Sequence, residues 1–331
     1  MKIITYNAWH GLNGEGILRH GELEAPPHRA RRLQRQVQKL QELGPDVAFL
    51  QEVNPLAARL PALQRDLSMN AVGQSDLCGI KCWGKGIPAN LSSGLAILAR
   101  EQLRKLRGPR LSGSKWSFAK LNFSFQTSET RYALLAELKS RALGRLLVVN
   151  AHMHHGFEPS PGLLGQLQVL AHEKIITEEQ RAHVVGEMER ARARRLGEGR
   201  RLLDEIAKAG LGYEGIVLAG DMNADPEAAV IDLIKDHGFV DIAPAGLHTW
   251  DKDRNAYNFQ LSSTFSLPVS DFGISALKEL LHAQYHRVTR LDYIFVSKNL
   301  ADRVRSVTMF GHDMPSEEIM SDHFGIVAEL R

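Results

Sequence analysis

The sequence predicts a single α+β domain, in which buried strands recur along the chain and helices lie between some of them. Three observations support this class. Apolar runs of strand length occur from one terminus to the other, helical patterns follow several of these runs, and neither a repeat nor a linker divides the 331 residues. We therefore expect one domain over residues 1–331.

Composition and charge indicate a folded protein without a strong electrostatic bias. Hydrophobic residues make up 44% and charged residues 24% of the chain, and the formal net charge of +3 neither requires nor excludes a nucleic-acid partner. Cys78 and Cys82 are too few for a disulfide framework. No signal-type segment follows Met1, and no apolar stretch approaches the roughly 20 residues of a membrane span. We expect a cytoplasmic protein with neither a transmembrane segment nor an obligate protein partner.

The N-terminal half is predicted to contain two strand–helix units followed by further strands. Ile3–Asn7 is an apolar strand, and a polar loop over 10–27 separates it from a helix that Gly44-Pro45 ends. Val47–Leu50 is the second strand, and Leu56–Leu67 is the second helix. The segments that follow are a loop over 70–93 and strands over 94–99, 131–138 and 145–150.

Residues 156–210 are predicted to be a charged helical insertion. Thr177 and Gln180 have the spacing of a capping box, Gly197 and Gly199 interrupt the long helix that follows, and Gly210 ends it. An arginine cluster on this insertion has two interpretations: a solvated helix whose glutamates offset the charge, or an arm that grips a polyanion. The cluster consists of Arg190, Arg192, Arg194, Arg195, Arg200 and Arg201, and the glutamates are Glu187, Glu189 and Glu198.

The C-terminal part is predicted to supply three more strands. One covers 215–220 and carries Asp221, and Asp225-Pro226 has the form of an N-cap and first turn for a helix over 227–237. Residues 244–289 are irregular apart from a helix over Ser275–Tyr285. The remaining strands cover 290–297 and 324–330.

Oxygen-bearing side chains stand at the edges of several predicted strands. Glu52 ends the second strand, and one or two protein carboxylates suffice to bind Mg²⁺ because water and substrate phosphate complete its coordination. Asn7 ends the first strand and offers a neutral amide that orients metal-bound water or a phosphate oxygen. Each residue taken alone also fits an exposed carboxylate or a turn amide.

Two further groups are suited to proton transfer and water positioning. Asp221 and Asn223 place an anionic acceptor beside an amide donor, which suits an attacking water next to a phosphoryl oxygen. Asp292 lies inside an apolar strand, where a charge is costly unless paired, so we expect an Asp292–His323 pair. Asp322 precedes His323 and adds another carboxylate to the set.

His152 follows an apolar strand and has two interpretations. It acts alone, or it joins His154 and His155 in a transition-metal cluster. We favour the first interpretation, because the other candidate residues are oxygen ligands rather than imidazoles and thiolates.

Taken together, six segments resemble the endonuclease/exonuclease/phosphatase superfamily, which has the DNase I-like fold. The resemblance implies a four-layer αββα sandwich of two packed mixed β-sheets with helices outside and the site at one end of the sheets. Residues 156–210 are then a helical insertion in that sandwich. The segments are Thr5-Tyr6-Asn7, Leu50-Gln51-Glu52-Val53, Asn150-Ala151-His152, Gly220-Asp221-Met222-Asn223, Arg290-Leu291-Asp292-Tyr293 and Ser321-Asp322-His323.

The resemblance also implies roles for individual residues. Metal ligands are Glu52, Asn7 and Asp322, and substrate-phosphate contacts are Asn7, Asn223 and His152. The catalytic residues are His152, Asp221, Asn223, Asp292 and His323. In this scheme His323, steadied by Asp292, is the base or the phosphate-orienting histidine, and His152 assists the leaving oxygen.

The implied activity is hydrolysis of phosphoester bonds with Mg²⁺, or alternatively Mn²⁺, by one-step attack of an activated water. A phosphodiesterase is favoured, a DNA or RNA nuclease is the alternative, and a non-catalytic binding module is the least favoured reading. Trp9 replaces the acidic residue of abasic-site endonucleases, and other segments are closer to the neutral sphingomyelinase-like and bacterial members. The substrate stays open among phospholipid headgroups, nucleic acid and inositol phosphates. Segments considered for membrane contact or base stacking are Phe259–Phe272, Trp83, Trp116 and Trp250.

Overall fold

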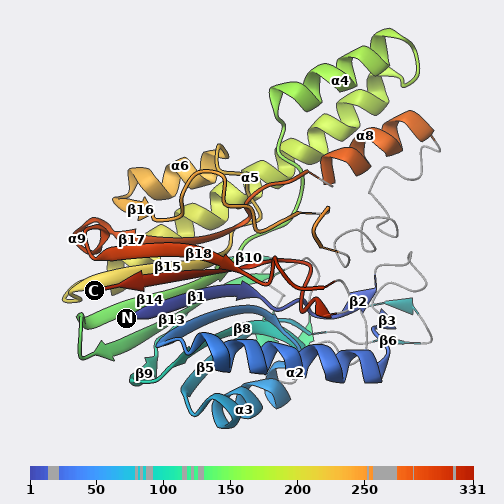
Figure 1. The fold of residues 1–331 in the computed structure, drawn as a ribbon. Coiled ribbons are helices and arrows are strands. Elements are labelled where there is room, and N and C mark those ends of the chain that lie inside the picture. The colour runs from blue at the N-terminus through green and yellow to red at the C-terminus, as the bar shows by residue number, and fades with distance from the viewer. Residues whose placement is uncertain are drawn as a thin grey trace.

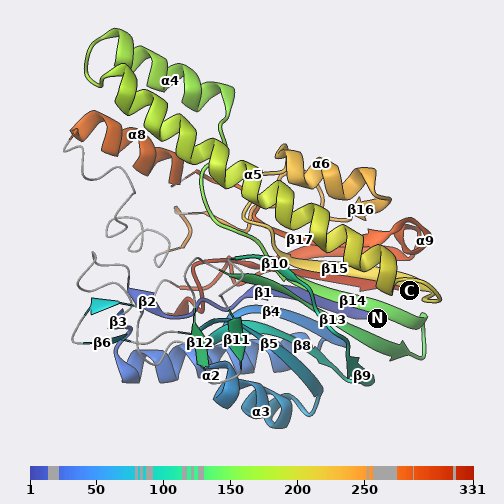
Figure 2. The ribbon, with the colours of Figure 1, turned by 180° about the vertical axis from the view of Figure 1, so that it is seen from behind.

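Two mixed β-sheets pack face to face, and helices cover their outer surfaces (Figures 1 and 2). This arrangement, seen in a computed structural model, confirms the expected four-layer sandwich. The structure describes residues 1–13, 22–78, 81–82, 85–86, 92–113, 118–120, 123–125, 130–251, 253–255, 274–285, 287–315 and 318–331.

The first sheet has six strands, and the N-terminal strand lies near its centre. β1 pairs in parallel with β4 and antiparallel with β19, so the two ends of the chain are neighbours in one sheet. The strand order is β18 (Val304–Phe310), β19 (Gly325–Leu330), β1 (Lys2–Asn7), β4 (Val47–Val53), β8 (Ser92–Ala99) and β5 (Asn70–Cys78).

The second sheet has seven strands and one parallel pair, β14 with β15. Its order is β10 (Arg110–Ser112), β13 (Arg131–Ser140), β14 (Gly144–His152), β15 (Gly215–Asp221), β17 (Asp292–Ser297) and β16 (Phe239–Asp241), and β9 (Gln102–Lys105) also pairs with β13. Three two-stranded pairs lie apart from these sheets: β2 (Leu12–Asn13) with β3 (Glu22–Leu23), β6 (Lys81–Cys82) with β7 (Lys85–Gly86), and β11 (Phe118–Lys120) with β12 (Phe123–Phe125).

The helices divide between the two outer surfaces. α2 (Pro26–Leu43) and α3 (Leu56–Leu67) cover the first sheet, and Gly44 ends α2 in the left-handed conformation that glycine adopts at little cost (Figure 1). α5 (Glu178–Ala209) and α6 (Ala229–Asp236) cover the second sheet, and the short α9 (Lys298–Ala301) follows β17. α4 (Pro161–His172) and α8 (Ser275–Tyr285) pack against the N-terminal half of α5, beyond the sheets.

Alternation along the strands produces three apolar layers. Ile3 packs between the sheets, whereas Ile4 faces α2 and α3. Val148 likewise packs between the sheets, and Val149 faces α5 and α6. Because successive strand side chains point to opposite faces, strands covered on both sides are continuously apolar, which is why the sequence shows apolar runs rather than alternation.

Several local predictions were wrong. The expected loop over 70–93 contains β5 and the start of β8, because pairing with β8 decides the structure of a polar, Gly-containing segment that has weak strand propensity. α5 runs through Gly197 and Gly199 without interruption. Asp225 does not cap α6, whose N-cap is Ala228. The strands β9, β10, β16 and β18 were not anticipated.

Topology brings the predicted site residues to one edge of both sheets. The parallel strands β1 and β4 end side by side, with Asn7 opposite Gln51. In the second sheet, His152 lies opposite Asp221, and Asp221 lies opposite Asp292 at the start of the antiparallel β17. Among the described residues, no helix is both long enough and apolar enough to cross a membrane.

Candidate active site

Strained backbone shapes this edge of the sandwich. Trp9, Glu52 and Asn223 have positive φ angles of 53°, 55° and 49°, which non-glycine residues seldom adopt. Glu52 lies where the β4–β8 register shifts, so an irregularity in the strand turns its side chain toward the site. Gly220, with φ 144°, passes so close to β14 that a Cβ atom would lie 1.9 Å from the Ala151 carbonyl oxygen. Such positive-φ residues gather at functional sites when the surrounding fold enforces them.

Glu52 is an oriented carboxylate. Its Oε1 accepts a hydrogen bond from Asn7 Nδ2 at 3.3 Å, and its Oε2 accepts one from the backbone N–H of His10 at 2.9 Å. Burial by itself raises the pKa of Glu52, but His10, His152 and His323 outweigh it and lower that pKa to about 2. Glu52 is therefore ionised at neutral pH.

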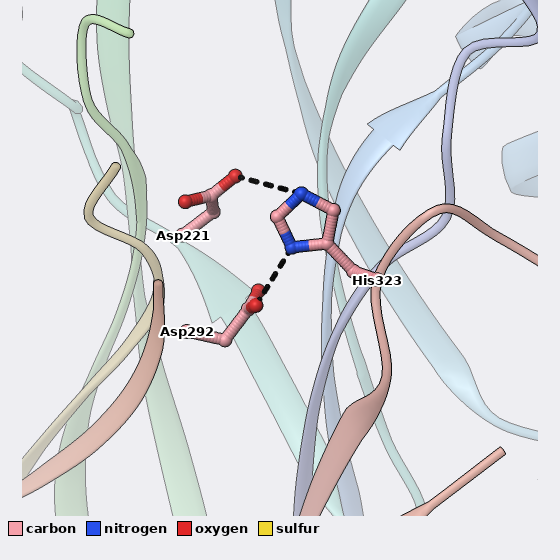
Figure 3. A group of neighbouring side chains, drawn as sticks. All are labelled: Asp221, Asp292 and His323. Carbon is pink, nitrogen blue, oxygen red and sulfur yellow. Dashed lines mark hydrogen bonds and ion pairs between the residues drawn. The ribbon is translucent and has the colours of Figure 1, made fainter. Parts of the chain in front are cut away.

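Asp221 and Asp292 lie side by side on neighbouring strands of the second sheet, and both face the ring of His323 (Figure 3). His323 Nδ1 donates to Asp292 Oδ2 at 2.8 Å, and His323 Nε2 lies 3.8 Å from Asp221 Oδ2. The hydroxyl of Thr249 accepts hydrogen bonds from the backbone N–H of Asp292 and of Leu291, which fixes the start of β17. The expected Asp292–His323 pair is therefore present in the structure.

The charges in this group shift the pKa values of Asp221 and His323. Burial alone lowers the pKa of His323, but Asp292 and Asp221 hold that pKa well above its ordinary value. Burial raises the pKa of Asp221 to about 7, with His323 opposing the shift and Asp292 adding to it. At neutral pH the imidazole is therefore charged, and Asp221 is a carboxylate of near-neutral basicity.

Asn7 and Asn223 hold Asp221 from two sides. Asp221 Oδ2 accepts a hydrogen bond from Asn7 Nδ2 at 3.0 Å, and its Oδ1 accepts one from the backbone N–H of Asn223 at 2.8 Å. The side-chain amide of Asn223 donates to the Met153 carbonyl, directly after β14. Each carboxylate oxygen of Asp221 is thus fixed in direction.

His152 approaches the same carboxylates from β14. Its Nε2 lies 3.6 Å from Asp221 Oδ2 and 3.9 Å from Glu52 Oε1. Its Nδ1 lies 3.1 Å from Arg131 Nη1, and Arg131 in turn contacts Asp76 at 3.1 Å. Because arginine only donates, His152 Nδ1 is the acceptor, and the proton of a neutral ring lies on Nε2, toward the site.

Sequence reasoning did not identify Asp76 or Arg131 as site residues. Asp76 lies on the strand that was predicted as a loop, and its side chain is 4% exposed. Arg131 was considered only as the start of a strand. The pairing of Asp76 with Arg131, 55 residues away in the chain, gave no local signal in the sequence.

Asp322 completes the set from the segment before β19. Its Oδ1 accepts from Ser321 Oγ at 3.2 Å, and the same hydroxyl also lies 2.6 Å from the Asn7 carbonyl oxygen. Burial raises the pKa of Asp322, and the negative charge of Glu52 acts in the same direction. Glu52 and Asp322 therefore repel each other, and a cation near both would relieve that repulsion.

Two of the motif residues have structural roles. Asn150 Nδ2 donates to the carbonyl oxygens of Leu50 and Ala96, at 2.9 Å each, and Gln51 Nε2 donates to Asn150 Oδ1 at 2.8 Å. These fully buried amides tie the two sheets together directly behind the site. They hold the distance between the strands that carry Glu52 and His152.

Of the three tryptophans considered for base stacking, the structure describes Trp250, and its burial favours packing. Trp250 is 5% exposed, and its ring meets the edge of His323 with centroids 4.9 Å apart. Trp83, Trp116 and the segment Phe259–Phe272 lie outside the described residues.

The alternative histidine cluster is not supported. Within the described part of the chain, the single group with metal-ligand spacing is Asp221, Asp292 and His323, so His152, His154 and His155 do not form one. Both nitrogens of His323 already face carboxylates, Asp292 at 2.8 Å and Asp221 at 3.8 Å. Glu52 and Asp322 are two further carboxylates of the site, and the charge of Glu52 helps to raise the pKa of Asp322.

Comparisons with known proteins agree with the fold. A model of the endonuclease/exonuclease/phosphatase family matches residues 4–323, and a search of curated proteins gave no match. One similar solved structure is a humanized TDP2 of D. rerio, with 17% identity, a TM-score of 0.58, and coverage of 100% of this chain and 98% of that chain. Another is a family protein from Leptotrichia buccalis, with 18% identity, a TM-score of 0.57, and coverage of 100% of this chain and 99% of that chain. A third is a family protein from Bacteroides thetaiotaomicron, which is 16% identical with a TM-score of 0.59. The match covers 100% of this chain and 97% of that chain.

These identities show a common fold and nothing finer. The family match is broader evidence, because it runs from the first strand to the histidine that follows Asp322 and so includes every strand end described above. The chain belongs to the endonuclease/exonuclease/phosphatase family, whose members hydrolyse phosphoester bonds.

Proposed function

We propose that the protein is a Mg²⁺-dependent phosphodiesterase and that residues 1–331 act as one domain. The observation that carries this proposal is the convergence of three carboxylates and two histidines on one strained edge. Glu52, Asp221 and Asp322 supply hard oxygen atoms, and His152 and His323 supply donors for a phosphate.

The residues fit a divalent cation. Glu52 is ionised and oriented, and Asp322 lies close enough to Glu52 for the charge of one to raise the pKa of the other. Glu52, Asn7 and Asp322 would hold the ion, and Mg²⁺ prefers this oxygen set over the nitrogen and sulfur ligands of transition metals. When bound, the ion neutralises charge that develops on the phosphate during attack.

Different side chains around this position accept and donate protons during the reaction. Asp221 accepts the proton of the attacking water, because its pKa of about 7 matches neutral operation and its oxygens are held by Asn7 and Asn223. Charged His323 donates to a phosphoryl oxygen while Asp292 stabilises its charge. His152 directs its Nε2 proton toward the site and assists the leaving oxygen from there.

The residues of the site account for the type of reaction but do not by themselves specify the substrate. One similar structure is D. rerio TDP2 complexed with single-strand DNA product, which is 18% identical to this chain and has a TM-score of 0.54. That likeness supports testing nucleic acid first. The sphingomyelinase-like placement and a phospholipid substrate remain predictions, as does a cytoplasmic location.

Substitution of Glu52 by Gln tests the proposal. The change keeps the shape of the side chain and removes the charge that would bind the cation. We expect hydrolysis of bis-p-nitrophenyl phosphate with Mg²⁺ to fall by at least about 10²-fold, since a positioned charge contributes on the order of several kcal/mol to such a transition state. EDTA should abolish hydrolysis by the wild-type protein, and added Mn²⁺ should restore part of that activity.

The matched control is Glu42→Gln, because Glu42 is an exposed carboxylate on α2. Equal thermal unfolding of the three proteins would exclude loss of fold as the cause. Wild-type rates for Glu52→Gln, or full activity in EDTA, would rule out the metal assignment, and no turnover of any phosphoester would favour a binding module.

A further inference from the structure

A basic hollow of about 450 Å³ lies between α5 and β10, outside the catalytic edge. Its volume falls within the range typical of ligand pockets. Among the described residues that line it, three are arginines and none is acidic; they are Arg110, Leu111, Ser112, Gly113, Ala193, Arg194, Gly197 and Arg201. We name this feature the α5–β10 pocket.

The structure separates the arginines of the insertion into two kinds. Arg190 and Arg192 contact Glu187 and Glu189 one helical turn away, so surface pairs offset their charge. Arg195 is fully buried against Glu158. The solvated-helix interpretation therefore holds for Arg190 and Arg192, whereas Arg195 is a buried structural residue.

The pocket arginines are held differently. Arg201 donates to the carbonyl oxygen of Leu111, which carries no formal charge, and within the described chain it forms no ion pair with a carboxylate. Arg194 donates to Ser112 Oγ at 3.2 Å and more distantly, at 3.4 Å, to the buried Glu198. These contacts place the guanidinium groups of Arg194 and Arg201 on the pocket wall.

Gly197 keeps the pocket open. A Cβ atom at this position would meet nothing closer than Arg201 Nη2, at 3.9 Å. At Gly199, in contrast, a Cβ atom would lie 2.8 Å from Val230, so packing against α6 explains that glycine. Glycine inside a helix is unfavourable, and within the described part of the chain no packing contact accounts for Gly197.

The pocket adjoins the catalytic edge through β10. Ser112, on the pocket wall, is the register partner of Arg131, which contacts His152. Glu198, beside Arg194, also accepts the backbone N–H of His154, two residues after His152. One pair of neighbouring strand ends therefore separates the pocket from the candidate active site.

We propose that the α5–β10 pocket binds a second phosphate of the substrate and thereby selects a single nucleic-acid strand over a phospholipid headgroup. This proposal rests on the proposed function. A strand presents phosphates at regular intervals, so one can occupy the catalytic edge while another reaches the guanidinium groups. A choline-type headgroup has a single phosphate and leaves the pocket unused. Arginine suits phosphate because its planar group donates two parallel hydrogen bonds.

Gly197→Glu tests the pocket, because it inserts a carboxylate beside Arg201 while removing an unfavourable helical glycine. Gly186→Glu is the matched control, since it makes the same change on the same helix outside the pocket. Binding of a fluorescein-labelled oligothymidylate is measured by anisotropy in EDTA, so that no turnover occurs. We expect Gly197→Glu to weaken binding by roughly fivefold to tenfold and to flatten its salt dependence, with Gly186→Glu within about twofold of wild type.

Hydrolysis of bis-p-nitrophenyl phosphate, which has one phosphate, should be the same in all three proteins. Equal binding by the two variants would overturn the pocket assignment. Pocket-dependent sedimentation with sphingomyelin or phosphatidylserine vesicles, without pocket-dependent oligonucleotide binding, would overturn the choice of nucleic acid. If wild type bound the oligonucleotide through the pocket yet hydrolysed no phosphoester, the proposed function would fail and the pocket would stand.

Discussion

At the scale of single residues, Asp292 decides the charge of His323. The carboxylate accepts from Nδ1 at 2.8 Å and helps to hold the pKa of the ring well above its ordinary value. In Asp292→Asn the ring loses this partner, so its pKa should fall and the ring should lose its proton at a lower pH than in wild type. We expect kcat at pH 8 to drop by about 10²-fold, the lower end of what a positioned acid or base contributes.

The titration of His323, followed by NMR of its ring protons, separates this effect from a loss of fold. Asp253→Asn is the control, because Asp253 is an exposed carboxylate near Trp250. An unchanged His323 midpoint in Asp292→Asn would contradict the assigned pairing, even if activity fell.

The residues that sequence reasoning found and missed differ in their chemical context. Asp292 was predictable because a charge within an apolar strand needs a partner, and His323 was the available one. Asp76 was not predictable, because its segment is polar and its partner Arg131 is distant in sequence. The strand irregularity that places Glu52 could not be predicted from the sequence either, since the register shift arises from pairing with β8 rather than from a local pattern.

At the scale of elements, α5 provides a comparison between two glycines of one helix. Gly197→Ala adds a side chain in open space, so we expect it to stabilise the fold by up to about 1 kcal/mol through helix propensity. Gly199→Ala gains the same propensity but places Cβ 2.8 Å from Val230, whose branched side chain adjusts with difficulty. The second variant should be less stable than the first by about 1–3 kcal/mol, the usual cost of overpacking.

Chemical denaturation of both variants checks this order. The expected difference lies in the midpoint, with similar slopes, since neither change alters the surface exposed on unfolding. If Gly199→Ala proved as stable as Gly197→Ala, the packing of α6 on α5 would be looser than the structure shows.

The same two glycines show why element predictions succeeded and failed. The capping box at Thr177 is a local pattern, and the structure contains both of its hydrogen bonds. Gly197 and Gly199 suggested an interruption of the long helix because glycine has a low helix propensity. Burial of Leu202, Leu203 and Ile206 against the second sheet outweighs the cost of two glycines, and sequence alone did not show that contact.

At the scale of the whole molecule, a polar network ties the second sheet together. Glu137 on β13 accepts hydrogen bonds from Arg104 on β9, Arg145 on β14 and Tyr213 before β15. The hydrogen bonds from Arg145 and Arg104 lower the pKa of Glu137 to about 2. Three segments distant in sequence thus depend on one ionised carboxylate.

This network predicts a defined dependence of stability on pH. A carboxyl group whose pKa is lower in the folded state stabilises the fold fully above its unfolded pKa of about 4.3, and the contribution is lost as pH falls toward 2. Glu137→Gln should therefore be less stable than wild type at pH 6, and the difference should shrink steadily between pH 5 and pH 3. Thermal unfolding across this range measures it, with Glu329→Gln, an exposed carboxylate on β19, as control. A constant difference at every pH would mean that Glu137 acts by shape and neutral hydrogen bonding, and that its charge contributes nothing to holding β9, β13 and β14 together.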